Sequence, residues 1–296
     1  MLDIPTTWLS AAEALRPGQT IAVVGDTDVG KSTFAEWLVR SLTPRGAVGL
    51  VDCDLGQTTL GPPTTVGGKV FDAQPESCDD LWPEAIAFVG STSPRGHLLQ
   101  TTAAAAQVCH ALRDKQPTFL VIDTSGFVAG GAGRALKVNK LKVVRADTAV
   151  VIERAQELAG LAWALAAAGI DVVRLAASPA VANRSAEQRR TRRQEKFAAY
   201  FAKAKPLALD LGRVLGSEQA CRIDCNLFTR ALVSLDDASG RCLGLGVVEE
   251  CDVSSGRAQV LTPVADDSAV RAMVVGSLRL AAHGSELAGD PRPAPR

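Results

Sequence analysis

Short apolar runs alternate with amphipathic stretches along the first 200 residues of the chain. The apolar runs lack the polar alternation of a half-exposed strand, so they predict strands that are buried on both faces. These strands are expected at residues 20–24, 47–52, 86–89, 118–123, 148–152 and 172–175. Helical periodicity predicts helices at residues 6–15, 32–42, 98–112, 158–168 and 185–201. The alternation predicts an α/β fold, with a parallel β-sheet flanked by helices on both faces.

The pattern changes after residue 205. Residues 206–280 contain short apolar runs and frequent turn signals such as DDASG, which predict a small β-rich C-terminal domain. Residues 281–296 end in DPRPAPR and are expected to form a disordered tail. Residues 1–18 are a helical extension, which leaves residues 19–205 as the main domain. Within it, residues 56–80 are rich in Gly, Pro and Thr and indicate a loop with at most a short hairpin.

The strand predicted at residues 20–24 leads directly into GDTDVGKST, a P-loop in its required order of strand, glycine-bounded turn and helix. The two glycines let the backbone amides face inward and form an anion site for phosphates. Lys31 is expected to reach the β- and γ-phosphates, and the Ser32 hydroxyl to ligate Mg²⁺. The predicted nucleotide-binding residues are Gly25, Asp26, Thr27, Asp28, Val29, Gly30, Lys31, Ser32 and Thr33.

Three aspartates stand at or just after the ends of predicted strands. Asp52 and Asp54 belong to VDCDLGQTT, and Asp123 belongs to VIDTSGFVAG. Carboxyl ends of parallel strands meet at one edge of the sheet, beside the P-loop. Such carboxylates bind Mg²⁺ or accept a proton from an attacking hydroxyl. We therefore expect all three, with Ser32, around the metal.

The net charge is zero, but positive charge is concentrated in two stretches. Residues 134–145 hold five basic residues and no acid, and residues 184–205 hold eight basic and two acidic residues. The second stretch contains RSAEQRRTRRQEKFAAYF, in which basic residues at helical spacing share one face. A mobile Arg-rich helix in a P-loop kinase suits a lid that neutralises transition-state charge. Phe197, Tyr200 and Phe201 are expected to anchor its other side.

The composition points to a cytoplasmic protein. No apolar run reaches the length of a membrane span, and the first ten residues lack the basic start and apolar core of a secretory signal. The seven cysteines are scattered and odd in number, which suits a reducing compartment.

The ordered set GDTDVGKST, VDCDLGQ, GSTSP, VIDTSGFVAG and the Arg-rich helix resembles the polynucleotide 5′-hydroxyl kinase family. Its eukaryotic members work in tRNA splicing, mRNA 3′-end cleavage and pre-rRNA processing, and this chain is most similar to the compact prokaryotic members. The resemblance covers about residues 19–201, with a weaker match to the family's small β-domain at 227–248. It implies transfer of the γ-phosphate of ATP to the 5′-hydroxyl end of single-stranded RNA, and potentially of DNA.

The resemblance also implies residue roles. Asp54 is the expected general base for the 5′-hydroxyl, while Asp52 matches a more variable acidic position. Phe127 matches an aromatic residue, often Trp, that stacks on the terminal nucleotide. The remaining matches are the catalytic lid arginines Arg189, Arg190 and Arg193, and the substrate residues Gln57, Thr92, Ser93 and His97.

Two departures from the family leave the choice between RNA and DNA open: His97 stands where relatives have Asn, and Phe127 replaces Trp. Two other functions remain as alternatives. A dethiobiotin-synthetase-like enzyme has a similar P-loop but does not need the arginine cluster. A non-catalytic nucleotide switch of the partitioning-ATPase type requires a lysine early in the P-loop, where Asp26, Thr27 and Asp28 stand here.

Overall fold

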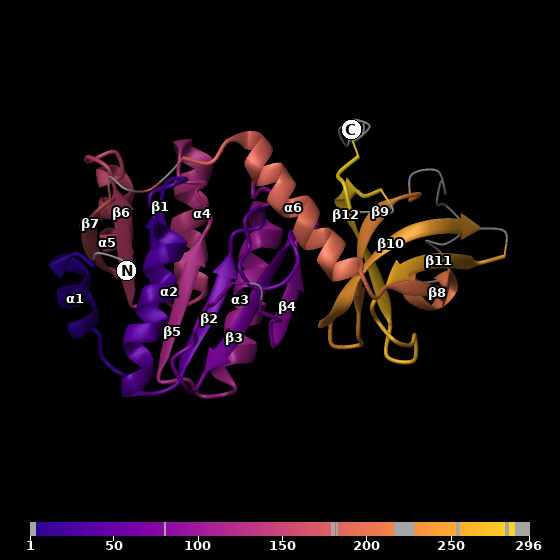
Figure 1. The fold of residues 1–296 in the computed structure, drawn as a ribbon, viewed down its shortest axis with the longest axis horizontal. Helices are drawn as coiled ribbons and strands as arrows, with labels where there is room; N and C mark the ends of the chain where they lie inside the picture. The colour runs from indigo at the N-terminus through magenta and orange to yellow at the C-terminus, as the bar shows by residue number, and fades with distance from the viewer. Residues whose placement is uncertain are drawn as a thin grey trace. The chain divides into compact units, whose positions relative to one another are not determined.

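A computed structural model describes residues 4–79, 81–178, 181, 183–215, 228–252, 255–281 and 284–287 (Figure 1). These residues fall into two compact units. The first comprises residues up to 61, 66–87 and 93–185. The second comprises residues 62–65, 88–92 and those from 186 onward.

The first unit is built on a seven-stranded sheet with the strand order β4-β3-β2-β5-β1-β6-β7. The strands β2, β5, β1, β6 and β7 run parallel to one another, and β3 runs antiparallel to β2. Their bounds are β1 Thr20–Gly25, β2 Val48–Cys53, β3 Thr65–Phe71, β4 Ala85–Phe88, β5 Phe119–Thr124, β6 Thr148–Glu153 and β7 Asp171–Ala176. The sheet is therefore mixed at one side, because the loop after β2 returns as a strand that pairs with β2 itself.

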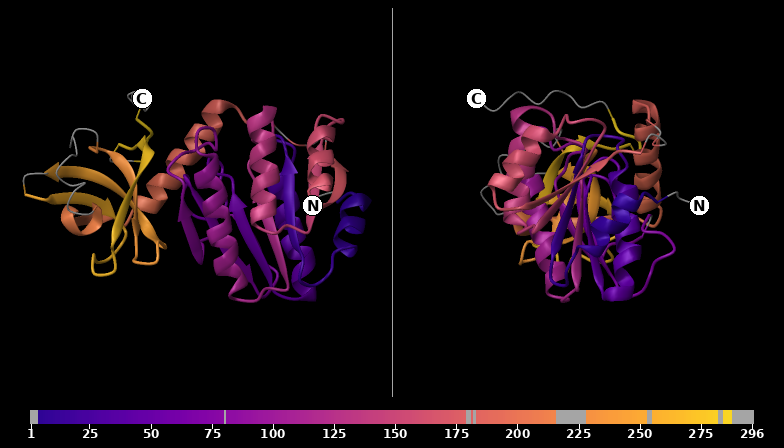
Figure 2. Two further views of the ribbon diagram at one scale, coloured as in Figure 1. Left: turned by 180° about the vertical axis from the view of Figure 1, so that it is seen from behind. Right: turned by 90° about the vertical axis from the view of Figure 1, so that its left-hand side faces the viewer.

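Helices cover both faces of this sheet, as the two views in Figure 2 show. The helices α1 and α2 pack together on one face, and α3, α4 and α5 lie on the other. Trp8, Phe34 and Trp37 form an aromatic cluster between α1 and α2, with ring centroids 4.9–5.6 Å apart. The bounds are α1 Thr6–Glu13, α2 Lys31–Leu42, η1 Thr43–Arg45, α3 Leu98–Arg113, α4 Gly130–Val143 and α5 Ala159–Ala167.

The second unit contains a five-stranded antiparallel sheet in the order β12-β9-β10-β11-β8, with the long helix α6. Its core includes Leu209, Val233, Leu235, Val248 and Val260, which are nearly inaccessible to solvent. The bounds are α6 Ala186–Phe201, β8 Lys205–Asp210, α7 Leu211–Leu215, β9 Ala231–Asp236, β10 Cys242–Asp252, β11 Arg257–Thr262 and β12 Ala272–Arg279. The predicted fold class, an α/β P-loop domain with a small β-rich domain, is confirmed.

Two domain limits differ from those expected. The Arg-rich helix α6 groups with the second unit rather than with the main domain, because its apolar side is buried there. Phe197 is inaccessible, and the Tyr200 hydroxyl accepts a hydrogen bond from the Leu245 amide at 2.6 Å. The tail expected to be disordered from residue 281 also contains an ordered stretch, because Glu286 pairs with Leu280 in an antiparallel bridge. The rest of that tail, residues 282–283 and 288–296, lies outside the described residues.

Candidate active site

The P-loop connects the central strand β1 to α2. Its backbone enters the left-handed region at Asp28 (φ 51°) and at Gly30 (φ 90°), the residue that precedes the first turn of α2. A Cβ atom at Gly25 would lie 2.6 Å from the Ile152 carbonyl oxygen, so only glycine allows β1 and β6 to approach this closely. The predicted sequence of strand, curled loop and helix N-terminus is therefore present, with the geometry of an anion site.

The Lys31 side chain is 94% buried, since only 6% of its surface is exposed. Its Nζ donates a hydrogen bond to the Asp26 carbonyl oxygen at 2.6 Å, across the P-loop. The Asp26 carboxylate in turn accepts a hydrogen bond from the Thr27 amide at 2.7 Å. The positive charge of Lys31 is thus held at the mouth of the loop by the loop's own backbone.

Ser32 and Asp123, two of the residues expected around the metal, are in direct contact. The Ser32 hydroxyl donates to Asp123 Oδ2 at 2.6 Å, and Asp123 is 3% exposed. Asp123 Oδ1 is buried and makes no hydrogen bond to any residue that the structure describes. Burial and the neighbouring Asp52 carboxylate raise the pKa of Asp123 to about 7. A buried carboxylate oxygen without a partner, beside a serine hydroxyl, fits a divalent cation as the missing partner.

Asp52 does not have the free oxygens that a metal ligand needs. Its Oδ1 accepts the Asp54 amide at 2.8 Å. Its Oδ2 accepts hydrogen bonds from both the amide and the hydroxyl of Thr59, and from the donors Thr58 Oγ1 and Leu60 N. No group of three or more acidic, Cys or His side chains within the described part of the chain is arranged to hold one ion. These contacts favour a structural role for Asp52, in place of the expected metal ligand.

Asp54 lies just beyond the end of β2, where the chain leaves the sheet. Its Oδ1 accepts hydrogen bonds from the Gly56 and Gln57 amides at 3.1 and 2.9 Å, and the side chain is half-buried. In the register of the sheet, Asp52 pairs with Asp123, so Asp54 follows at the same edge as the Ser32–Asp123 pair. Asp54 therefore stays accessible, unlike Asp52.

The basic stretch at residues 134–145 is less available to a nucleic acid than its composition indicates. Lys137 and Lys140 in α4 are inaccessible to solvent, which removes two of the five charges from the surface. Lys137 Nζ donates to the Thr124 hydroxyl at 2.9 Å and to the Ser125 carbonyl oxygen, and burial lowers its pKa well below the usual range. These two lysines are therefore not available to a nucleic acid, and Lys137 instead supports the loop after β5.

That loop carries Phe127, which is half-buried. The Arg95 guanidinium lies over its ring, 5.8 Å from the centroid. Sequence reasoning missed Arg95, although it directly follows the GSTSP motif. Of the expected substrate residues in this motif, Thr92 is half-buried and Ser93 is exposed, with the Ser93 hydroxyl accepting the Arg95 amide at 3.2 Å. His97 is half-buried and precedes α3, where its carbonyl oxygen accepts the Thr101 amide.

Two further residues, Arg154 and Arg184, support the P-loop. The Arg154 Nη2 donates to the Asp28 carbonyl oxygen at 2.6 Å, and the Arg184 amide donates to the Asp28 carboxylate at 3.1 Å. Arg154 directly follows β6 in a loop without a motif, so no sequence signal marks it, whereas Arg184 is the first residue of the motif RSAEQRRTRRQEKFAAYF.

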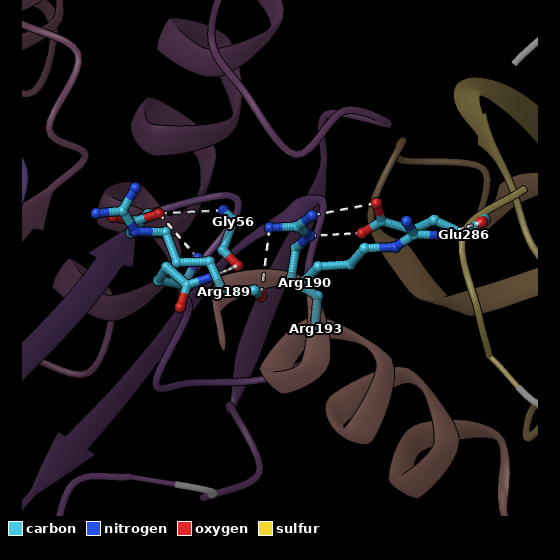
Figure 3. A network of polar contacts seen from close by, with 7 residues as sticks. Gly56, Arg189, Arg190, Arg193 and Glu286 are labelled. Carbon is cyan, nitrogen blue, oxygen red and sulfur yellow. Dashed lines mark hydrogen bonds and ion pairs between the residues drawn. The ribbon is translucent and has the colours of Figure 1, made fainter. Parts of the chain in front are cut away.

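Two arginines of α6, Arg190 and Arg193, contact the C-terminal segment of their own unit. Arg193 forms an ion pair with Glu286, and Arg190 donates to the Glu286 carbonyl oxygen at 3.4 Å (Figure 3). The Arg189 carbonyl oxygen accepts a hydrogen bond from Arg193 Nη1 at 3.3 Å. The expected helix thus places its three arginines on neighbouring turns, and two of them contact a residue that the sequence analysis placed in a disordered tail.

Comparisons with known proteins agree with the motifs. The family model of the mRNA cleavage and polyadenylation factor CLP1 P-loop matches residues 25–203. The polyribonucleotide 5′-hydroxyl-kinase of Thermococcus kodakarensis is 31% identical over 96% of this chain and 95% of its own length. The polyribonucleotide 5′-hydroxyl-kinase of Pyrococcus horikoshii is 27% identical over 96% of this chain and 93% of its own length.

A solved structure of a Clp1p–Pcf11p complex shares the fold, with a TM-score of 0.69 and 13% identity over 93% of this chain and 77% of that one. None of the helices in the described ranges is long and apolar enough to cross a membrane. The sequence analysis left two alternatives open, a dethiobiotin-synthetase-like enzyme and a nucleotide switch of the partitioning-ATPase type. The family model and the full-length relatives support neither of them. By its P-loop, the ordered motifs and the extent of these matches, the chain belongs to the CLP1 P-loop family.

Proposed function

We propose that this protein is a polyribonucleotide 5′-hydroxyl kinase that transfers the γ-phosphate of ATP to the 5′-hydroxyl end of single-stranded RNA. The observation that carries the proposal is the arrangement at the carboxyl edge of the first sheet. Lys31 and the P-loop amides offer positive charge to phosphates, and Asp54 stands at the same edge as an accessible carboxylate. The full-length relatives bearing this activity in their names support the same reaction.

Magnesium fits the pair of Ser32 and Asp123, whose hydroxyl and unpartnered carboxylate oxygen are hard oxygen donors. When bound there, the ion would neutralise charge on the β- and γ-phosphates. The protein's own part is to orient those phosphates with the P-loop amides and Lys31. Asp52 holds residues 54–60 in place and so fixes the position of Asp54.

Asp54 acts in this proposal as the general base that accepts the proton of the RNA 5′-hydroxyl. Its Oδ1 is fixed by two backbone amides, which orients the carboxylate without burying it. Gln57, Thr92, Ser93 and His97 are the candidates for holding the RNA end, with Phe127 stacking on its base. Arg189, Arg190 and Arg193 are the candidate lid residues that stabilise the transferring phosphoryl group.

Transfer of labelled γ-phosphate tests the proposal directly. Matched RNA and DNA oligonucleotides with 5′-hydroxyl ends would be offered with ATP and Mg²⁺, and the same RNA with a 5′-phosphate serves as the control acceptor. We expect label on the 5′-hydroxyl RNA, none on the phosphorylated RNA, and loss of transfer when Mg²⁺ is chelated. Hydrolysis of ATP without transfer to either acceptor would contradict the proposed reaction.

A further inference from the structure

The second unit contains a short segment that lies far in sequence from the C-terminal residues that form most of the unit. Residues 88–92, which lead from β4 into the GSTSP motif, group with the C-terminal sheet rather than with the rest of the first unit. GSTSP, residues 90–94, is called the clasp below, because Thr92 and Ser93 in it are the candidates for holding the RNA end. The contacts of its first residue, Gly90, define how it is anchored.

Gly90 is held by β12 through two hydrogen bonds to one atom. The Ser277 amide and the Ser277 hydroxyl both donate to the Gly90 carbonyl oxygen, at 2.8 and 2.9 Å. The ladder between β12 and β9 is interrupted at this point, since the register shifts between Val275 and Arg279. A bulge of this kind turns backbone groups away from their own sheet. Here the Ser277 amide, which is not used in the ladder with β9, donates its hydrogen bond to the clasp.

The backbones of Gly90 and Gly276 meet without side chains between them. A Cβ atom at Gly90 would lie 2.6 Å from the Gly276 Cα, and one at Gly276 would lie 2.9 Å from the Gly90 carbonyl oxygen. Gly90 also has a φ of 77°, which disfavours any residue with a side chain. The contact therefore requires glycine on both sides.

The same segment is fixed from its other side by Thr64. The Thr64 carbonyl oxygen accepts the amides of Val89 and Gly90, at 2.9 and 3.1 Å. Thr64 is inaccessible and has a φ of 73°, which is rare for a β-branched residue. Strained backbone of this kind persists only where its surroundings hold it, and it is concentrated at functional sites.

We infer that the C-terminal β-domain positions the clasp, and that Ser277 and Gly276 are positioning residues for the RNA 5′ end. Thr92 follows Gly90 by two residues, so the hydrogen bonds that hold the Gly90 carbonyl also restrict the position of the backbone that carries the Thr92 hydroxyl. The β-domain then contributes to substrate recognition through this anchor. The inference rests on the proposed function, because it assumes that the clasp binds the acceptor rather than ATP alone.

Steady-state kinetics with separate titrations of oligonucleotide and ATP tests this role. Ser277→Ala removes one of the two hydrogen bonds and should raise the oligonucleotide KM about threefold, and Ser277→Thr, which keeps the hydroxyl, should restore it. Gly276→Ala should raise the oligonucleotide KM about tenfold or more, because it displaces Gly90. The ATP KM should stay unchanged in all three variants.

Thr262→Val is the matched control. It removes a buried hydroxyl that donates to the Leu245 carbonyl oxygen at 2.8 Å and accepts the Val264 amide at 3.2 Å, and both of these partners lie outside the clasp. It should lower the melting temperature and leave the oligonucleotide KM unchanged. An unchanged oligonucleotide KM in both Ser277→Ala and Gly276→Ala, or an equal rise in Thr262→Val, would overturn the inference.

Amide exchange gives a readout that does not depend on catalysis. Exchange at residues 88–93 should be faster in Ser277→Ala and Gly276→Ala than in the wild type or in Thr262→Val. Equal protection in all four proteins would also overturn the inference. Failure of the wild type to phosphorylate any oligonucleotide would instead contradict the proposed function, and the exchange data would still report whether the anchor exists.

Discussion

The guanidinium of Arg193 contacts both carboxylate oxygens of Glu286, with Nε donating to Oε1 and Nη2 donating to Oε2 at 3.1 Å. Only 17% and 16% of the two side chains are exposed, so this bidentate pair is shielded from solvent. A lid arginine that acts on phosphates has to exchange this partner for the nucleotide. The pair therefore competes with the role proposed for Arg193.

Glu286→Gln should weaken that competition. If Arg193 acts on the phosphates, we expect the ATP KM to fall about twofold to fivefold, while Arg193→Ala lowers kcat about tenfold or more. The double variant should behave like Arg193→Ala, because the Glu286→Gln change can act on the ATP KM only through Arg193. A purely structural pair would give the same loss of activity and stability in both single variants, which a thermal melt and the two KM values would reveal.

Lys31→Ala should reduce phosphoryl transfer about a thousandfold or more, because it removes the only P-loop cation aimed at the transferred group. The lost hydrogen bond joins the buried Lys31 amine to a carbonyl oxygen of its own loop, so circular dichroism and the melting temperature should change little. Lys31→Arg is the control for charge alone, and the longer side chain with its planar guanidinium should not restore activity. Near-normal transfer by Lys31→Ala would refute the phosphate-binding role.

Asp52→Asn and Asp54→Asn should separate structure from catalysis. Asp52 accepts five hydrogen bonds while buried, so its amide analogue presents an NH₂ group to donors; we expect destabilisation of about 2–4 kcal/mol. Asp54→Asn should keep the melting temperature and the ATP KM while kcat falls about a hundredfold or more. Urea unfolding and initial rates measure the two effects. The opposite assignment holds if Asp52→Asn folds normally and loses kcat.

The sequence predicts most of the first sheet, because buried strands and a P-loop leave strong local signals. The pattern of residues places both Asp52 and Asp54 at the metal, and only the family resemblance assigns them different roles. The difference arises where β2 ends at Cys53 and the chain turns, so that five donors from residues 54–60 surround both oxygens of Asp52, while Asp54 accepts two amides on one oxygen. That arrangement depends on the path of a loop, which periodicity does not describe.

Charge patterning is similarly incomplete. Lys137 and Lys140 contribute to a basic stretch in the sequence, but in α4 they share the buried face with Leu136 and Leu141. A lysine is placed in a core only if its amine finds partners or loses its charge, as Lys137 does. The partner of Arg193 lies 93 residues away in the C-terminal segment, a separation that no local pattern indicates. Long-range contacts of this kind come from tertiary structure alone.

The contact between Arg95 and Phe127 suggests a combined site for the first nucleotide, with the ring stacking on a base and the guanidinium beside a backbone phosphate. Phe127→Ala should raise the oligonucleotide KM by about 5-fold to 150-fold, since stacking contributes about 1–3 kcal/mol per base. The ATP KM should change little. Substitution of the first base should have a small effect, because stacking tolerates any base.

Arg95→Gln should weaken RNA binding and reduce the slope of log affinity against log salt by about one, as expected for loss of one phosphate contact. Arg40→Gln is the matched control, because it removes the same charge from a residue that pairs with Glu36 on the surface of α2. Fluorescence anisotropy with a labelled 5′-hydroxyl RNA at several salt concentrations measures both slopes. Equal slopes in Arg95→Gln and Arg40→Gln would show that Arg95 serves only to pack against Phe127, and that the phosphate contact lies elsewhere.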